Sequence, residues 1–198
     1  RARRRSIFEA MEAAKQGRDP ANFRRRLLDY LQEGMDPESF QRLVEAETID
    51  FSVCNHMLNK VNNAAEAGEL RGITIRFLES YPEHPVLLTL RAVSESMNDD
   101  CDDSVTLDSL RNLLGSAASK YSMTPASLDM AIATIANTAE QRTPRLFPAL
   151  LLALEDSGYQ ATDPALNFKA LTRRAMGVAA DDVADLMLVQ RLKAGVSN

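Results

Sequence analysis

The sequence predicts an all-α protein: an array of about eleven helices packed as antiparallel hairpins, either as a bundle or as a short helical-repeat-like stack. Three observations support this prediction. Capping residues stand directly before proline at five places, apolar residues recur every three or four positions between them, and glycines follow several of these apolar stripes. Together they describe helices with defined beginnings and ends.

The capping residue and the proline act on the same end of a helix. The Asp or Thr oxygen accepts a hydrogen bond from an amide of the first turn, and proline has no amide hydrogen to leave unpaired. The five pairs are Asp19-Pro20, Asp36-Pro37, Thr124-Pro125, Thr143-Pro144 and Asp163-Pro164. Glycines stand where C-terminal caps are expected, at Gly17, Gly34, Gly68, Gly158 and Gly177.

The apolar stripes between the caps have helical spacing. One stripe runs through Leu107, Leu110, Leu113 and Tyr121, and the next runs through Leu128, Ala131, Ile132, Ile135 and Ala139. With the caps, the stripes predict helices near residues 3–16, 20–33, 37–46, 50–67, 69–80, 84–98, 105–121, 125–140, 144–156, 164–176 and 180–193.

Two segments depart from the simple amphipathic pattern. Residues 72–78 alternate as a strand does, but a single strand leaves its backbone groups without partners, and Leu70, Ile73 and Phe77 fit a helix equally well. We therefore expect a helix there. Residues 147–154 are apolar on nearly all sides, which is typical of a buried helix, so we place it in the middle of the second half.

An acidic run divides the chain into two parts. We expect a helical half at 1–98 with a basic leading segment, an acidic linker or loop at 99–104, and a second helical half at 105–198; one continuous domain is the alternative. A calcium loop that starts at Asp99 would need Gly at its sixth position and Glu at its twelfth, where Ser104 and Leu110 stand. We interpret the run as a solvated loop that places negative charge at the next helix N-terminus.

Charge is unevenly distributed along the 198 residues, whose net charge is −5. Residues 1–26 hold nine Arg and Lys against three acidic residues, so this segment carries +6 and the remainder carries −11. The interpretation that we favour is a solvated face or a junction with an upstream domain; contact with nucleic acid or with an acidic protein partner are the alternatives. The candidate contact residues are Arg3, Arg4, Arg5, Arg18, Arg24, Arg25 and Arg26.

Two further surfaces are candidates for contact. A second basic strip comprises Arg142, Arg145, Lys169, Arg173, Arg174 and Arg191, and the sequence leaves open whether it joins the first. The predicted C-terminal helix at 181–193 has a wide apolar surface, which we expect to dock on the core. Self-association into a homo-oligomer through this helix is the alternative.

The sequence predicts no catalytic, cofactor or metal site. Cys54 and Cys101 lack CxxC spacing, so we expect reduced thiols, one of them buried. His56 lies two positions from Cys54, a spacing that does not bring side chains together on a helix, and we interpret it as a satisfied core or boundary histidine. For His84 we expect local capping or exposure. Neither GxxxxGK[ST] nor GxGxxG is present, so no standard nucleotide-binding loop is expected.

The function that these patterns favour is a non-catalytic helical interaction or accessory domain. Because the first residue is Arg1, we expect a fragment of a larger protein, with a protein partner or an upstream domain. The alternative is a helical extension of a nucleic-acid-dependent ATPase such as a helicase, which contacts nucleic acid through the Arg-rich N-terminal region; a small enzyme with an undetected pocket is the third hypothesis. No segment reaches the roughly 20 apolar residues of a transmembrane helix, and we expect a cytoplasmic protein.

Overall fold

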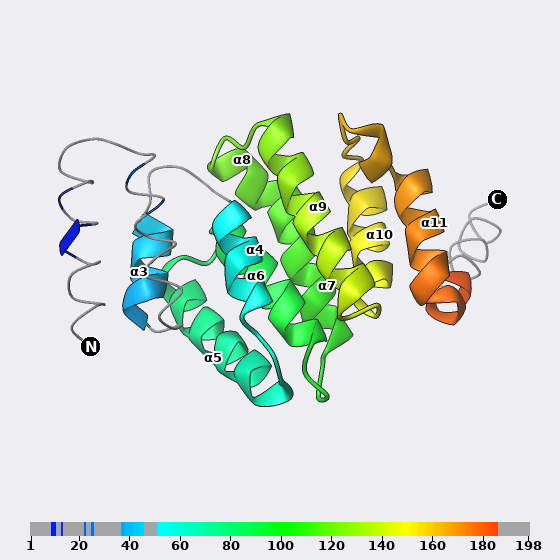
Figure 1. Cartoon of the computed structure of the whole chain (residues 1–198). Helices are drawn as coiled ribbons and strands as arrows, with labels where there is room; N and C mark the ends of the chain where they lie inside the picture. The colour runs from blue at the N-terminus through cyan, green and yellow to red at the C-terminus, as the bar shows by residue number, and fades with distance from the viewer. Residues whose placement is uncertain are drawn as a thin grey trace.

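The computed structural model describes residues 9, 10, 13, 22, 25, 37–45 and 51–185. Within these residues all regular secondary structure is helical, so the predicted all-α class is confirmed. The helices lie side by side in a row that runs from α3 to α11 (Figure 1). Their bounds are α3 Pro37–Glu45, α4 Phe51–Asn59, α5 Ala64–Ser80, α6 Pro85–Ser96, α7 Asp103–Asn112, a π-helical segment η1 Leu113–Ala117, α8 Ala118–Lys120, α9 Pro125–Gln141, α10 Leu146–Ser157, a 3-10 turn η2 Pro164–Leu166 and α11 Phe168–Val178. Residues 180–185 are also helical.

Several predictions fall on residues that the structure does not describe. They are most of the expected helices at 3–16 and 20–33, the cap pair Asp19-Pro20, the glycines Gly17 and Gly34, the capping residue Asp36, and the helix at 180–193 beyond residue 185. Of the helices that are described, none has the length and apolar character needed to cross a bilayer.

The boundary between α4 and α5 differs from the prediction. We expected one helix to end at Gly68, but the break lies at residues 60–63 and Gly68 is inside α5. The reason is a reciprocal cap: the Asn63 side chain accepts a hydrogen bond from the Glu66 amide at 2.9 Å, and the Glu66 carboxylate accepts one from the Asn62 amide at 2.7 Å. Residues 73–78 lie in α5, so the helical interpretation of that segment is confirmed.

The predicted caps before proline have mixed outcomes. The Thr124 hydroxyl accepts a hydrogen bond from the Ser127 amide at 3.1 Å, so the α9 cap is confirmed. The prediction for Thr143 is wrong, because its hydroxyl donates to the Ser96 carbonyl at 3.0 Å and α10 begins two residues after Pro144 with no side-chain cap. Because the Thr143 hydroxyl makes this long-range bond, it does not cap α10.

The C-terminal elements also have different boundaries from those expected. Asp163 caps the short turn η2 rather than an α-helix, and Asn167 caps α11 through a 2.8 Å bond from the Ala170 amide. Gly177 lies inside α11, so its predicted capping role is wrong. Gly158 does end α10, in the left-handed conformation with φ of 66°, which glycine adopts without steric cost.

One hydrophobic core extends along the row of helices. It includes buried side chains on both sides of the acidic run, from Phe40 in α3 to Val183. Helix α10 is buried on most of its surface, as predicted, and it packs against α7, α9 and α11. Its buried residues are Leu146, Phe147, Ala149, Leu150, Leu151, Ala153 and Leu154. The helix expected at 105–121 runs without a break through α7, the π-helical η1 and α8.

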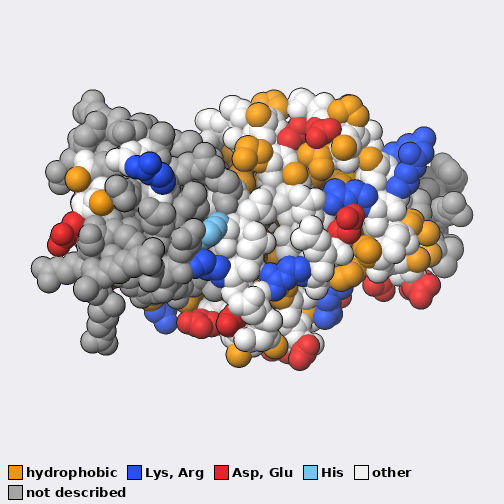
Figure 2. All heavy atoms as spheres, in the orientation of Figure 1, with side chains coloured by type: hydrophobic (Ala, Val, Ile, Leu, Met, Phe, Trp, Pro, Cys, Tyr) orange, Lys and Arg blue, Asp and Glu red, His pale blue; other side chains and the backbone are white. Residues whose placement is uncertain are grey.

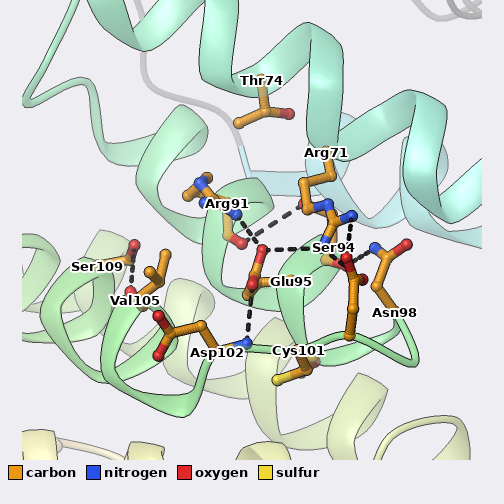
Figure 3. A network of polar contacts seen from close by, with 12 residues as sticks. Arg71, Thr74, Arg91, Ser94, Glu95, Asn98, Cys101, Asp102, Val105 and Ser109 are labelled. Carbon is orange, nitrogen blue, oxygen red and sulfur yellow. Dashed lines mark hydrogen bonds and ion pairs between the residues drawn. The ribbon is translucent and has the colours of Figure 1, made fainter.

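A buried carboxylate joins α5, α6 and the loop before α7 (Figure 3). Glu95 is 4% exposed and accepts hydrogen bonds from Arg91 at 2.5 Å, from Arg71 at 3.4 Å and from the Asp102 amide at 2.9 Å. Arg71 also forms a two-pronged pair with Asp100, at 2.9 and 3.2 Å. Burial alone would raise the pKa of Glu95, but these hydrogen bonds and positive charges outweigh it and lower the pKa, so the carboxylate is ionised at neutral pH.

This network anchors the acidic run. The expectation of a solvated loop is confirmed, since all of its residues but Cys101 are exposed. Two of its side chains are nevertheless held, because Asp100 pairs with Arg71 and Asp102 caps α7 by accepting a 3.0 Å bond from the Ser104 amide. Asp103 supplies negative charge in the first turn of α7, as predicted. The loop is therefore fixed to the helices on either side of it.

Substitution of Glu95 tests the contribution of the network to stability. Glu95→Gln should lower the free energy of unfolding by about 2–3 kcal/mol, because it leaves two partly buried arginines with a neutral acceptor. Urea unfolding followed by circular dichroism measures the change. Asp108→Asn is the control, since the exposed Asp108 lies 3.9 Å from Arg111 and its loss should cost less than about 0.5 kcal/mol. A Glu95→Gln protein as stable as the parent would contradict this account.

His84 is buried at the beginning of α6, where its Nδ1 accepts a 3.3 Å hydrogen bond from the Val86 amide. Its ring meets Tyr121 edge to face, with ring centroids 5.3 Å apart. Of the two predicted alternatives, capping is confirmed and exposure is wrong. Burial lowers the pKa of His84 to about 4, so the ring is neutral at pH 7 and Nδ1 is free to accept.

The lowered pKa of His84 predicts a pH dependence of stability. Between its ordinary value of 6.5 and its folded value of about 4, the unfolded chain binds the proton and the folded chain does not, so stability falls as the pH is lowered. From about pH 7 to about pH 5.5 the loss due to this ring should be about 1 kcal/mol. Urea unfolding at both pH values measures it. His84→Asn keeps a capping side chain and should lose less stability over this range; an equal loss in both proteins would argue against the assignment.

Candidate functional site

An open hollow of about 670 Å³ lies at the junction of α10 and α11. Its walls are the last turn of α10, the connecting residues 158–163, the turn η2 and the first residues of α11. Most of the side chains that form it are apolar or aromatic, and Glu155 and Lys169 are the charged ones. The lining residues are Leu154, Glu155, Gly158, Tyr159, Gln160, Ala161, Thr162, Pro164, Leu166, Asn167, Phe168 and Lys169. Its volume lies within the range of about 300–1,000 Å³ that ligand pockets occupy, and it is open to solvent.

The local sequence sets the course of the chain around this hollow. Gly158 turns the backbone away from α10, and the caps at Asp163 and Asn167 begin η2 and α11 in succession. Between these points Leu166 is buried against the core. One helix end and two helix beginnings within ten residues therefore shape the wall of the hollow.

A carboxylate from α9 holds the connecting residues in place. Asp129 is 8% exposed and accepts hydrogen bonds from the Tyr159 hydroxyl at 2.6 Å and from the amides of Thr162 and Asp163, each at 3.1 Å. The Thr162 hydroxyl donates to the same carboxylate. Burial would raise the pKa of Asp129, but these donors outweigh it and lower the pKa. For Tyr159, burial and the bond to Asp129 raise the pKa, so its hydroxyl stays protonated and donates.

Large apolar side chains are exposed at a few positions of the described surface, and one of them lines the hollow. Of the five large apolar residues exposed there, four belong to α9 and α11: Met130, Phe168, Met176 and Val178. Phe168, which lines the hollow, is 39% exposed. Figure 2 shows hydrophobic side chains gathered toward the upper edge of the molecule, with Lys and Arg side chains beside them over α11.

The basic residues of α11 are of two kinds. Arg174 is used within the fold, since it donates to Glu140 and to Asn137, both at 2.8 Å. Lys169 and Arg173 are exposed, and no ion pair holds either of them within the described part of the chain. Their spacing of four residues places them on one side of α11, next to the hollow that Lys169 lines.

Most of the predicted contact residues are not tested by the structure. Arg3, Arg4, Arg5, Arg18, Arg24 and Arg26 lie outside the described residues. Arg25 is exposed, and its guanidinium donates to the Asn22 side chain at 3.0 Å. The hypothesis of nucleic-acid contact through this segment stays a prediction.

The second basic strip is divided between two places. Arg142 and Arg145 line a separate hollow of about 360 Å³ beside the start of α10, whereas Lys169 lines the hollow at α11. The Arg142 guanidinium donates to the carbonyls of Leu58 and Val61, which ties the end of α9 to the end of α4. Arg191 lies outside the described residues.

Burial changes the pKa of both cysteines and of His56. Cys54 and Cys101 are free thiols, as predicted; Cys54 is buried, which raises its pKa, and burial together with a 3.4 Å contact to Asp103 raises the pKa of Cys101 to about 11. His56 is half-buried, as expected of a boundary histidine, and its Nε2 has no hydrogen-bond partner among the described residues. Burial, followed by the charge of Lys60, lowers its pKa. Among the described residues no group of three or more His, Cys, Asp or Glu side chains is arranged to hold a metal ion.

Sequence reasoning missed the hollow and the role of Asp129. The sequence does carry the local features that build the wall, namely Gly158, Asp163-Pro164 and Asn167. It gives no indication that the Asp129 carboxylate, 33 residues before Thr162, accepts a hydrogen bond from the Thr162 amide. Compared with models of known protein families, with curated proteins and with solved structures, the chain has no match.

Substitution of Asp129 should loosen the wall of the hollow. Asp129→Ala removes the acceptor for four donors, so the free energy of unfolding should fall by about 2–4 kcal/mol, and the Thr162 and Asp163 amides should exchange with solvent faster. Denaturant unfolding and hydrogen exchange measured by NMR test both effects. Asp185→Ala, at an exposed carboxylate, is the control. Unchanged protection of the Thr162 and Asp163 amides would show that other contacts hold this segment.

Proposed function

We propose that this chain is a non-catalytic helical interaction domain that binds a protein partner at the hollow between α10 and α11. The observation that carries the proposal is the exposure of Phe168 on the wall of a preformed, mainly apolar hollow. Exposed aromatic side chains beside an apolar pocket are typical of the residues that dominate protein–protein binding energy. The wider architecture in this proposal is a short stack of helical hairpins that serves as a rigid support.

The support for a preformed site is the hydrogen bonding of its wall. Asp129 orders residues 159–163 before any partner arrives, because the carboxylate already engages the Tyr159 hydroxyl and the Thr162 and Asp163 amides. A segment that is ordered beforehand loses little conformational entropy on binding, so more of the contact energy contributes to affinity. On the other side, the floor rests on Leu154 and Leu166, which belong to the core.

Replacement of Phe168 tests the proposal. A photo-crosslinking amino acid at position 168 of the full chain should capture a defined protein, whereas the same group at the exposed Ile75 in α5 should not. The captured protein is identified by mass spectrometry, purified and titrated against the chain. Phe168→Ser should weaken its binding by about tenfold or more, and Ile75→Ser should leave it within about twofold.

Several outcomes would contradict this function. Equal crosslinking at both positions, or a purified partner that binds Phe168→Ser as tightly as the parent, would remove the hollow as its binding site. Capture of a second copy of the chain would assign the surface to self-association. Binding of labelled nucleic acid that weakens with salt and with Arg24→Glu plus Arg25→Glu, together with no protein capture, would favour the accessory role in a nucleic-acid enzyme.

A further inference from the structure

The hollow between α10 and α11 has charges of opposite sign on its two sides. Glu155 lies on the α10 side and Lys169 on the α11 side. Arg173 extends the positive charge one turn along α11. A partner that fills the hollow therefore meets positive charge in one direction only, and this asymmetry bears on what the partner is.

The positive charge on the α11 side is available to a partner. Arg174, the neighbouring basic residue, is held by Glu140 at 2.8 Å, but Lys169 and Arg173 are exposed and take part in no ion pair among the described residues. This exposed basic pair lies beside the hollow although the chain as a whole carries a net charge of −5. Acidic groups of a partner would be attracted to this pair and repelled from Glu155.

The hollow itself favours an apolar anchor. Leu154 and Leu166 form a floor that is continuous with the core, and Phe168 stands beside it with 39% of its surface exposed. A buried leucine or aromatic side chain of a partner would displace water from this floor and cover the Phe168 ring. A volume of about 670 Å³ exceeds what one side chain fills, so the hollow suits a short segment of several residues.

We propose that the hollow binds a short acidic segment of a protein partner, with an apolar anchor residue against Phe168 and Asp or Glu side chains against Lys169 and Arg173. The inference rests on the proposed function and specifies its partner. The anchor supplies the affinity through apolar burial, and the acidic residues set the direction of the segment, with its acidic end over α11 and away from Glu155.

The test uses a phage-displayed library of random short peptides selected on the full chain. The enriched peptides should share an apolar residue with Asp or Glu within about four positions of it. The most enriched sequence is synthesised with a fluorescent label, and its Kd is measured by anisotropy. Phe168→Ser should raise Kd by about tenfold or more, and the double variant Lys169→Glu plus Arg173→Glu should raise it by about fivefold, with weaker salt dependence than the parent.

A matched control comes from the other end of the row of helices. Ile75 and Arg76 are an exposed apolar and basic pair on α5, so Ile75→Ser plus Arg76→Glu makes the same kinds of change away from the hollow and should leave Kd within about twofold. A peptide in which Lys replaces the acidic residues should bind the parent more weakly than the selected peptide does. The same Lys peptide should bind the Lys169→Glu plus Arg173→Glu variant more tightly than it binds the parent. Circular dichroism confirms that each variant is folded.

The outcomes separate this inference from the function on which it rests. Enriched peptides that depend on Phe168 but lack acidic residues, or whose Kd ignores Lys169→Glu plus Arg173→Glu, would overturn the acidic partner and leave the hollow as a protein-binding site. A selection that yields no peptide sensitive to Phe168→Ser would overturn both.

Discussion

Helix α10 lies against α7, α9 and α11, and its apolar side chains provide the surface on which those helices pack. Because it is apolar on most sides, it is stable only when helices surround it, and that requirement brings together residues separated by dozens of positions. The hollow lies at one end of this helix because Gly158 ends α10 there and the chain passes through the connecting residues and η2 before α11 begins. The packing of a single helix thus determines where the candidate site lies.

Two buried carboxylates stabilise loops in different ways. Glu95 accepts from two arginines and from the Asp102 amide, so its charge is balanced by cations. Asp129 accepts from hydroxyls and amides, and its charge is stabilised by neutral dipoles. In both cases a helix supplies the acceptor and a neighbouring connection donates at least one backbone amide to it, so the connection is fixed to the helix by a buried charge. One such loop joins α6 to α7, and the other forms the wall of the hollow.

The two faces of α11 explain why partner binding is proposed at this end of the molecule. One face is used within the fold, since Leu171 and Ala175 are buried and Arg174 pairs with Glu140. Lys169 and Arg173 lie on the other face and are exposed, and Phe168, in the first turn, is exposed at the edge of the hollow. The exposed Phe168 ring adjoins a hollow that the core already shapes, so the two form one apolar surface. An aromatic ring beside two basic groups favours a protein segment with apolar and acidic side chains.

The sequence by itself determined the all-α class, the helical identity of residues 73–78, the buried nature of α10, and the ends marked by Thr124 and Gly158. These features follow from periodicity and from hydrogen bonds between residues two to four positions apart, which a sequence shows directly. The boundary at Asn63 is equally local, since its cap bonds Glu66 three positions on, so the sequence contains this signal as well. Only the tertiary structure decided that Thr143 bonds to the Ser96 carbonyl and that Asp129 holds Thr162. These two interactions join residues 47 and 33 positions apart, and which donor meets which acceptor over such separations depends on how the helices pack.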